Sequence, residues 1–337
     1  MIERLGKTII LKNKPTIIGY GSIVGKKEHE GPLSNEFDEY IEDSYFGEES
    51  YEKAESKLQK NAVETALKRA NLTNNDIDNI FAGDLLNQCI GSSFGLRDFQ
   101  IPFIGLYGAC STMALSTALA SIFVNCGVAK NAVAVTSSHF CSAERQYRFP
   151  LGYGNQRTQT AQWTVTGSGA LVIGKGSNLP YINAVSFGAI QDLGITDTNN
   201  MGAAMAPAAA ETIANYFKDT NTTAEDYDIV YTGDLGRIGT DLLYDLMDEK
   251  GYNLRCRHAD CGNIIFDIDK QDVHAGGSGC GCSASVLASF VMHRFEENQF
   301  KNILFVSTGA LMSPTSALQG ESIPGIAHLL NIKKDSK

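Results

Sequence analysis

Residues 101–126 read IPFIGLYGACSTMALSTALASIFVNC, and the β-rich run Ala132–Val135 follows a short link. No charged residue occurs between Asp98 and Lys130. The pattern predicts a strand, a sharp turn at Gly108–Thr112, a helix and a second strand. A segment without charges is expected to be buried nearly all round. We therefore place this stretch at the centre of the fold.

The length of the uncharged stretch also raises the alternative of a transmembrane helix, because roughly 20 apolar residues span a bilayer. Gly105, Gly108 and several Ser and Thr residues interrupt it, and Pro102 lies near its start. No cluster of Lys or Arg flanks it, although such clusters usually orient a membrane span. The sequence therefore favours a buried helix in a soluble protein.

Cys110 lies in the turn that opens the predicted helix. A thiol in the first turn is close to the positive end of the helix dipole, which lowers its pKa and suits a nucleophile or a contact to an anion. Free cysteine is also common in protein cores. The stretch alone leaves both interpretations open.

The chain has 337 residues, 43% of them hydrophobic, and a formal net charge of −10. This length suits two units, which we predict at residues 1–175 and 176–337. The acidic balance disfavours a nucleic-acid partner or an anionic lipid surface, since both require a basic patch. The N-terminal residues lack the apolar core of a signal peptide, so we expect synthesis in the cytoplasm and free thiols rather than disulfides.

Two groups of His and Cys residues have the chemistry of zinc ligands: Cys256, His258 and Cys261, and His274, Cys280 and Cys282. Their spacings match no standard zinc finger. We therefore predict no metal site.

A helix, a linker and a strand ending in Gly-Asp-Leu occur twice, with the aspartates at Asp84 and Asp234. In each copy a Gly/Cys turn then opens an apolar helix, and a strand introduced by Lys-Asn follows at Lys130 and Lys301. The same elements in the same order predict an α/β protein made of two similar halves.

The second copy is longer, because an insertion falls around residues 252–275. Long connections inside compact domains are often functional. The insertion contains His258, Asp260 and Cys261, which we take as a second group of candidate site residues.

Residues 138–150 concentrate polar and aromatic side chains directly after a buried strand. Ligands of open α/β sheets bind beyond the carboxyl ends of strands. His139 and Arg145 are therefore predicted pocket residues, with helix capping or surface ion pairing as the alternative.

A duplicated α/β chain with a Gly-Ala-Cys-Ser-Thr turn at the start of a buried helix resembles the thiolase fold, in which two similar halves pack as αβαβα layers. Within that superfamily the chain is similar to the stage V sporulation protein AD family over essentially its whole length. The motifs that carry the resemblance are Gly31–Leu33, Ala82–Gln88, Tyr107–Thr112, Thr136–His139, Ala143–Gln146, Thr164–Gly169, Asp192–Asp197, Met205–Ala210, Ala275–Cys280 and Thr308–Leu311.

The chain departs from the enzymes of this fold, which pair their cysteine with His/Asn or His/Cys from the second half. The synthase motif His-Gln-Ala-Asn is replaced by Gly233–Leu235, and the thiolase motifs His-Pro and Cys-x-Gly by Gly276–Gly279 and Thr308–Gly309. A cysteine without a positioned base or oxyanion donors loses most of its rate. We therefore expect a binding pocket without catalytic residues. The alternative is an acyltransferase or condensing enzyme that uses Cys110.

The resemblance implies a non-catalytic protein that binds dipicolinate (pyridine-2,6-dicarboxylate). It implies membership of a spore membrane channel that moves dipicolinate into the forespore and out at germination. The implied partners are the other membrane proteins of the stage V sporulation A channel, with this chain peripheral on the outer surface of the forespore membrane. The fold class suggests a twofold homodimer by analogy.

The resemblance also implies ligand-binding roles for Cys110, His258 and Cys261. Asp260 matches the second acidic residue of the family motif His-Asp-Asp-Cys, whereas Ala259 replaces the first. No resident cofactor is implied. Calcium, which prefers oxygen ligands, is expected only together with dipicolinate, at Asp260 or Asp234.

A small planar dianion needs a flat slot and hydrogen-bond donors, and the helix start at Cys110 offers backbone N–H groups. Positive charge would come from three candidates: His258, His139 and Arg145. The two halves of a duplicated fold face each other. We therefore expect the insertion to close over Cys110 and to form one pocket with it.

Overall fold

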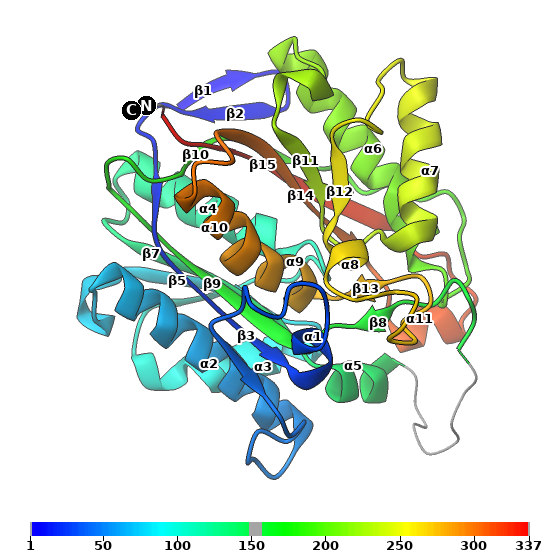
Figure 1. The fold of residues 1–337 in the computed structure, drawn as a ribbon, viewed down its shortest axis with the longest axis horizontal. Helices are drawn as coiled ribbons and strands as arrows, with labels where there is room; N and C mark the ends of the chain where they lie inside the picture. Colours follow the sequence, from blue (N-terminus) through cyan, green and yellow to red (C-terminus); the bar gives the residue numbers. More distant parts are fainter. Residues whose placement is uncertain (1, 148–156, 336–337) are drawn as a thin grey trace.

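The computed structural model describes residues 2–147 and 157–335. Ten strands follow one another across a 13-stranded sheet (Figure 1). Their order is β12 (His258–Asp260), β11 (Ile229–Thr232), β14 (Asn302–Ala310), β15 (Gly325–Lys333), β10 (Tyr181–Phe187), β3 (Thr16–Gly25), β9 (Gly167–Gly174), β7 (Ala132–Ser138), β5 (Asn79–Gly83) and β6 (Phe103–Gly105).

The two halves of this order correspond strand by strand. From the outer edge inward, the second half has β12, β11, β14, β15 and β10, and the first half has the equivalent strands β6, β5, β7, β9 and β3. The halves meet where Thr16 of β3 pairs with Tyr181 of β10. Individual hydrogen bonds are also repeated in the two halves. The Asp78 carboxylate accepts the backbone N–H of Lys130, and the Asp228 carboxylate accepts that of Lys301. The predicted duplication is confirmed.

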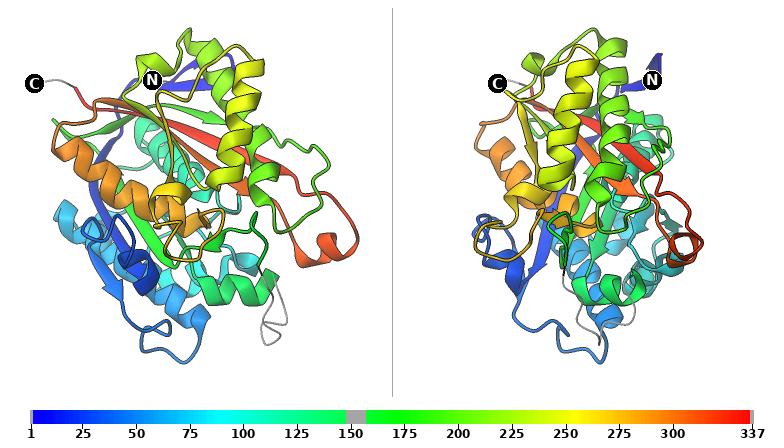
Figure 2. Two further views of the ribbon diagram at one scale, coloured as in Figure 1. Left: turned by 45° about the vertical axis from the view of Figure 1, so that its right-hand side comes forward. Right: turned by 90° about the vertical axis from the view of Figure 1, so that its right-hand side faces the viewer.

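The helices form three layers around the two half-sheets. Helix α2 (Tyr51–Ala70) covers the first half-sheet from outside, and α6 (Met201–Thr220) covers the second with α7 (Gly236–Glu249) packed on it. Helices α4 (Thr112–Cys126) and α9 (Cys280–Val286) lie between the half-sheets (Figures 1 and 2). The result is the predicted αβαβα arrangement.

The remaining elements are short. The helices are α1 (Lys26–His29), α3 (Ile90–Leu96), α5 (Phe140–Tyr147), α8 (Cys261–Ile264), α10 (Met292–Glu296) and α11 (Pro314–Leu318), and the strands are β1 (Ile2–Leu5), β2 (Thr8–Leu11), β4 (Glu39–Ile41), β8 (Trp163–Thr164) and β13 (Gly277–Ser278).

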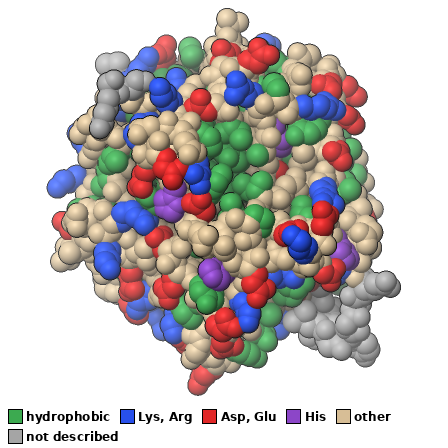
Figure 3. Space-filling view, viewed as in Figure 1, with side chains coloured by type: hydrophobic (Ala, Val, Ile, Leu, Met, Phe, Trp, Pro, Cys, Tyr) green, Lys and Arg blue, Asp and Glu red, His purple; other side chains and the backbone are tan. Residues whose placement is uncertain are grey.

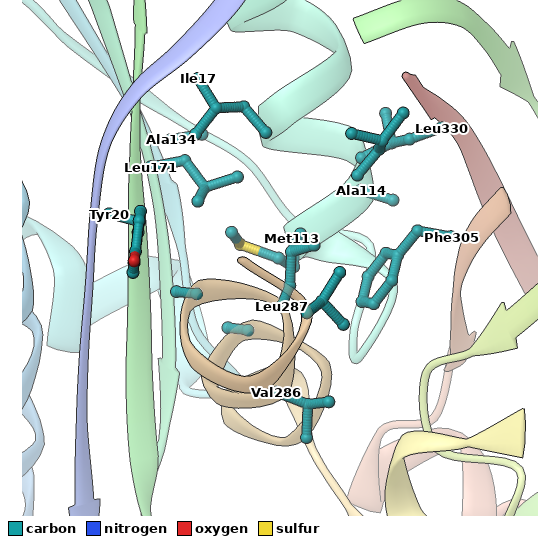
Figure 4. Close-up of a cluster of buried hydrophobic side chains, with 14 of the residues drawn as sticks. Ile17, Tyr20, Met113, Ala114, Ala134, Leu171, Val286, Leu287, Phe305 and Leu330 are labelled. Atoms are coloured by element: carbon teal, nitrogen blue, oxygen red, sulfur yellow. The ribbon is translucent and has the colours of Figure 1, made fainter. Parts of the chain in front are cut away.

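The buried core joins both halves through the central helices. In Figure 4, Met113 of α4 lies among Leu171 of β9, Leu287 at the end of α9 and Phe305 of β14. All four side chains are fully buried. The central layer therefore links the two halves through apolar packing, at roughly 1.5–3 kcal/mol for each large side chain buried.

The uncharged stretch is central only in part. Helix α4 and strand β7 are largely buried as predicted. The expected burial of residues 101–107 is wrong, because β6 is the last strand of the sheet and leaves Phe103 and Tyr107 exposed. Among the described residues, the segment Ala109–Cys126 is the one helix long and apolar enough to cross a membrane, and 72% of it is buried inside the protein. It serves here as the core helix.

The N-terminal hairpin crosses to the second half. Strand β2 pairs with β10, and the Asp219 carboxylate in α6 accepts the backbone N–H groups of Lys7 and Thr8. Residues 2–11 thus lie outside the half-sheet that carries the other strands of the first half. On the face shown in Figure 3, acidic and basic side chains are interspersed, without a continuous basic patch.

Candidate functional site

Cys110 lines a narrow pocket of about 60 Å³ between the two halves. One water needs roughly 10–15 Å³ of such space, so the pocket has room for several waters as it stands. Its described walls come from the first half at Leu85, Tyr107, Ala109, Cys110, Ala143, Glu144, Tyr147 and Thr164, and from the second at Thr198, Met201, Ser278, Gly279, Ala310 and Met312.

The pocket adjoins an outer groove of about 350 Å³. Tyr107, Tyr147 and Met312 line both spaces and therefore separate them. The Tyr147 hydroxyl donates to the carbonyl of Leu85 at 2.6 Å and lies 3.1 Å from the Tyr107 hydroxyl. The two tyrosines, joined through their hydroxyls, therefore form part of the wall between the groove and the Cys110 pocket.

The turn that carries Cys110 packs against the end of β14. A Cβ added at Gly309 would lie 2.4 Å from the carbonyl oxygen of Gly108, so only glycine permits this approach. Cys110 itself precedes the helix, which begins at Thr112 after the N-cap Ser111.

The structure favours one of the two interpretations of Cys110 that the sequence left open. Burial, and then the nearby Asp234 carboxyl, hold the pKa of its thiol well above the ordinary value. Desolvation and a neighbouring negative charge both disfavour the thiolate, which favours a buried core thiol over a nucleophile. The Sγ atom lies 3.9 Å from the Ser278 Oγ. A neutral thiol suits packing and weak hydrogen bonding better than nucleophilic attack.

Asp234 organises the wall of the pocket from within. Its carboxylate accepts hydrogen bonds from the Ser278 hydroxyl at 2.8 Å, the Gly279 N–H at 3.0 Å and the Thr308 hydroxyl at 2.6 Å. The side chain is fully buried, and burial raises its pKa. One carboxylate therefore fixes the glycine turn and the end of β14 around Cys110.

The insertion supports this turn from behind. Tyr244 donates to His258 Nδ1 (3.1 Å), His258 Nε2–H donates to the Thr232 hydroxyl (3.0 Å), and that hydroxyl donates to Asp260 (2.6 Å). This direction follows because the single Thr232 hydroxyl proton points to the carboxylate. Burial lowers the pKa of His258 to about 3, so its ring is neutral, and raises that of Asp260 to about 7.

Asp260 completes the arrangement by accepting the backbone N–H groups of Leu235 and Gly236 at 2.9 and 3.0 Å. These residues directly follow Asp234. The chain of hydrogen bonds from Tyr244 thus ends on the backbone that positions the Asp234 side chain.

The structure does not bring the insertion into the pocket. None of the described residues that line the Cys110 pocket comes from residues 252–275. Cys261 is fully buried in the main hydrophobic core. The expectation that the insertion closes over Cys110 to form one pocket is therefore corrected: its side chains act behind the pocket wall, because β12 pairs with β11 on the far side of Asp234.

His139 and Arg145 lie elsewhere. The His139 ring is buried, accepts the Cys141 N–H at Nδ1 and donates from Nε2 to the Ser44 carbonyl, and burial lowers its pKa. It lines a separate cavity beside α1. Arg145 pairs with Glu52 at the surface. Arg145 also lines a surface groove. Both residues thus line cavities other than the Cys110 pocket, and their contacts are those of helix capping and surface pairing.

The sequence pointed to Asp234 as half of a repeat and as a calcium ligand, but not as the organiser of the wall. Ser278, Thr308 and the Tyr107–Tyr147 pair were missed. The repeated Gly-Asp-Leu motif was the available signal for Asp234. Within the described residues, no three His, Cys, Asp or Glu side chains are grouped to hold a metal ion.

Comparisons with known proteins agree on one family. A family profile described as Stage V sporulation protein AD matches residues 6–333. Stage V sporulation protein AD of Bacillus subtilis (strain 168) is 47% identical over 308 residues, which cover 91% of this chain and 91% of that protein.

Solved structures match the fold at low identity. The 3-oxoacyl-(acyl-carrier-protein) synthase III of Aquifex aeolicus VF5 has a TM-score of 0.59 and 13% identity, covering 95% of this chain and 99% of its own. Cerulenin-bound OleA of Xanthomonas campestris has a TM-score of 0.60 and 14% identity, covering 99% of this chain and 98% of its own. These matches establish a thiolase-like fold. The family profile and the 47% identical relative show that the chain belongs to the stage V sporulation protein AD family.

Proposed function

We propose that this chain is a non-catalytic dipicolinate-binding component of the spore membrane channel, with its ligand site in the Cys110 pocket. The observation that carries the proposal is a pocket between the two halves whose thiol is held neutral and whose described lining contains no His, Lys or Arg. Such a pocket offers space for a small ligand, and its described lining supplies neither a thiolate nor a His base for acyl transfer.

The same lining decides the form of the ligand. Its one ionisable carboxyl among described residues is Glu144, which is buried, and Asp234 lies behind Ser278. A free dianion would meet the nearby Asp234 carboxyl in a protein whose net charge is −10. The 1:1 calcium chelate is neutral and presents a hard cation to carboxylate oxygen. We therefore assign the calcium chelate of dipicolinate as the bound species.

Turnover is not expected. Acyl transfer from a thioester requires a thiolate and a proton acceptor, and burial opposes the first. Incubation with acetyl-CoA and acetoacetyl-CoA should release no CoA above the rate of Cys110→Ala. Release that depends on Cys110 would instead favour a condensing enzyme.

Association with the forespore membrane is proposed to be peripheral and to depend on the channel proteins. The chain carries a net charge of −10, and its most apolar helix is the core of the fold. Purified protein should remain below the vesicles when floated with phosphatidylserine-containing liposomes at low salt. Stable co-flotation would contradict this.

A twofold homodimer through the β6 edge is part of the proposal. Strand β6 ends the sheet with Phe103 exposed, and Ile90 and Phe94 of the neighbouring α3 are exposed beside it. An unpaired edge with apolar side chains is suited to pair with a second copy. Sedimentation should show a dimer that Phe94→Asp with Phe103→Asp dissociates.

Calorimetric titration tests the ligand. We expect heat from dipicolinate with CaCl2, little from dipicolinate in EDTA, and none from isophthalate with CaCl2, because isophthalate lacks the ring nitrogen that completes the chelate. Ala143→Leu, which fills the pocket, should abolish binding, whereas Glu64→Leu at an exposed position of α2 should not. Ligand density outside the Cys110 pocket, or full affinity in Ala143→Leu, would refute the site.

A further inference from the structure

Two loops beside the pocket are tied into one projection, defined as residues 188–200 and 311–325. Gln191 and Gly325 exchange backbone hydrogen bonds, and the Ile323 N–H donates to the Ile195 carbonyl at 2.7 Å. The Ser322 hydroxyl donates to Asp192 at 2.6 Å. Figure 2 shows α11, the orange-red helix of this projection, standing out from the body of the protein.

The projection carries large aliphatic side chains that are exposed to solvent and lie outside the hydrophobic core. Leu318 is 89% exposed, Leu193 66% and Ile190 59%. Among the large hydrophobic residues described elsewhere in the chain, Val128 is 65% exposed and Phe94 53%, and the others are less exposed. Exposed apolar side chains gathered on one feature mark an interaction surface.

The charge of the projection is one-sided. Residues 188–200 and 311–325 contain Asp192, Asp197 and Glu321 and no Lys, Arg or His. A twofold contact between two such projections would bring like charges together, and an anionic lipid surface would repel them. The complementary surface is therefore aliphatic with a rim of basic side chains.

The projection also forms part of the ligand path. Thr198 and Met312 line the Cys110 pocket, and Ser313 and Pro314 line the outer groove. A partner bound to the projection would sit at the mouth of the groove. Ligand released past Tyr107 and Tyr147 would then emerge next to that partner.

We propose that the projection docks a Lys/Arg-bearing aliphatic loop of a membrane-embedded channel protein, an inference that rests on the proposed function. The acidic, aliphatic projection is complementary to a loop that carries aliphatic and basic side chains.

Photocrosslinking tests the surface. Benzoylphenylalanine is placed at 193, at 318 or at the control position 128 in the full chain. Each protein is co-expressed with one affinity-tagged, full-length membrane protein of the stage V sporulation A channel. We expect adducts with a tagged channel protein from positions 193 and 318 and none from 128. Adducts with a second copy of this chain, or equal yields from 128, would overturn the inference.

Charged substitutions test the chemistry. Leu193→Asp with Leu318→Asp, and separately Glu321→Lys, should reduce the share of protein that sediments with channel-containing membranes by at least about tenfold, the scale of losing central interface side chains. Val128→Asp should change nothing. Unchanged sedimentation of the Leu193→Asp/Leu318→Asp protein would refute the docking.

The two proposals fail separately. The purified Leu193→Asp/Leu318→Asp protein should bind the calcium chelate of dipicolinate with wild-type affinity, because neither side chain lines the pocket. Loss of chelate binding in the wild-type protein would refute the ligand assignment alone. If the double variant loses sedimentation with the membranes but keeps chelate binding, the loss is assigned to the projection alone. Weaker chelate binding in the double variant would contradict the separation of the docking surface from the pocket.

Discussion

The turns at Asp84 and Asp234 occupy equivalent positions in the two halves, at the ends of β5 and β11, and share the sequence Gly-Asp-Leu. The Asp84 carboxylate accepts from Leu86 and Ser92, which lie within eight residues of it. The Asp234 carboxylate accepts from residues 44 to 74 positions away. The same tripeptide closes its own loop in one half and joins distant segments in the other.

This difference explains why the pocket belongs to the Asp234 side. Asp84 sits near a second buried carboxyl, Glu55, whose pKa is raised by burial and by the Asp84 charge. Glu55 in turn accepts from the hydroxyls of Ser137 and Ser142. That cluster is enclosed. Around Asp234, by contrast, the hydrogen-bonded residues Ser278 and Gly279 line the Cys110 pocket.

The largest expected effect separates the two aspartates. Asp234→Ala leaves the Ser278, Gly279 and Thr308 donors unmatched and should lower the free energy of unfolding by about 3–5 kcal/mol and abolish chelate binding. Asp84→Ala should destabilise the protein by a similar amount yet preserve the affinity of the folded fraction. Denaturant titration with calorimetry decides it, and equal losses of affinity in both variants would remove the distinction.

Asp260 should make stability depend on pH. Its pKa is raised from 3.8 to about 7 by burial, so between these values the folded state holds a proton that the unfolded state has released. Stability should therefore fall by about 2–4 kcal/mol as pH rises through that window and stay level above it. Asp260→Asn should reduce the slope, to which the other buried carboxyls such as Glu55 also contribute, whereas the exposed control Asp269→Asn should keep it. Urea melts at several pH values would contradict this if both slopes were equal.

The two cysteines should act differently. Cys110→Ala should weaken chelate binding by about 1–3 kcal/mol, because the thiol lines the pocket. Cys261→Ala should leave binding unchanged and lower stability by about 1–2 kcal/mol through a small cavity in the core. The effects of the two substitutions on binding should then be additive. Measurable coupling in a double-mutant cycle would instead indicate that residues 252–275 contribute to the pocket.

The smallest expected effect is on the rate at which ligand passes Tyr107 and Tyr147 to reach the Cys110 pocket. Tyr147→Phe removes the hydroxyl that bonds Leu85 and Tyr107. Rates of ligand association and dissociation should both rise, with affinity changed by less than about 1 kcal/mol. Tyr107→Phe removes only the outer contact and should do less. Stopped-flow mixing measures this, and unchanged rates in Tyr147→Phe would mean that the passage lies elsewhere.

Local patterns were sufficient to predict much of the fold. Helix α4, strand β7, the repeat and the place of the insertion follow from periodicity and turn residues, which act over a few positions. The exposure of Phe103 could not be predicted from such local patterns, because it depends on which strand ends the sheet. The raised pKa of Cys110 and the role of Asp234 depend on burial and on partners such as Ser278 and Thr308, which are far apart in the chain.

The N-terminal hairpin has a consequence for biogenesis. Its strand β2 finds its partners in β10, and Gly6 is held in a left-handed conformation against Asp219. At about 5–20 residues per second, the ribosome needs roughly 10–40 s to reach that aspartate. The hairpin therefore remains without these partners until residue 219 has been synthesised. A nascent chain with unpaired strands is vulnerable to aggregation. The strand pairing of this fold therefore sets a minimum time during which the hairpin must stay soluble without its partners.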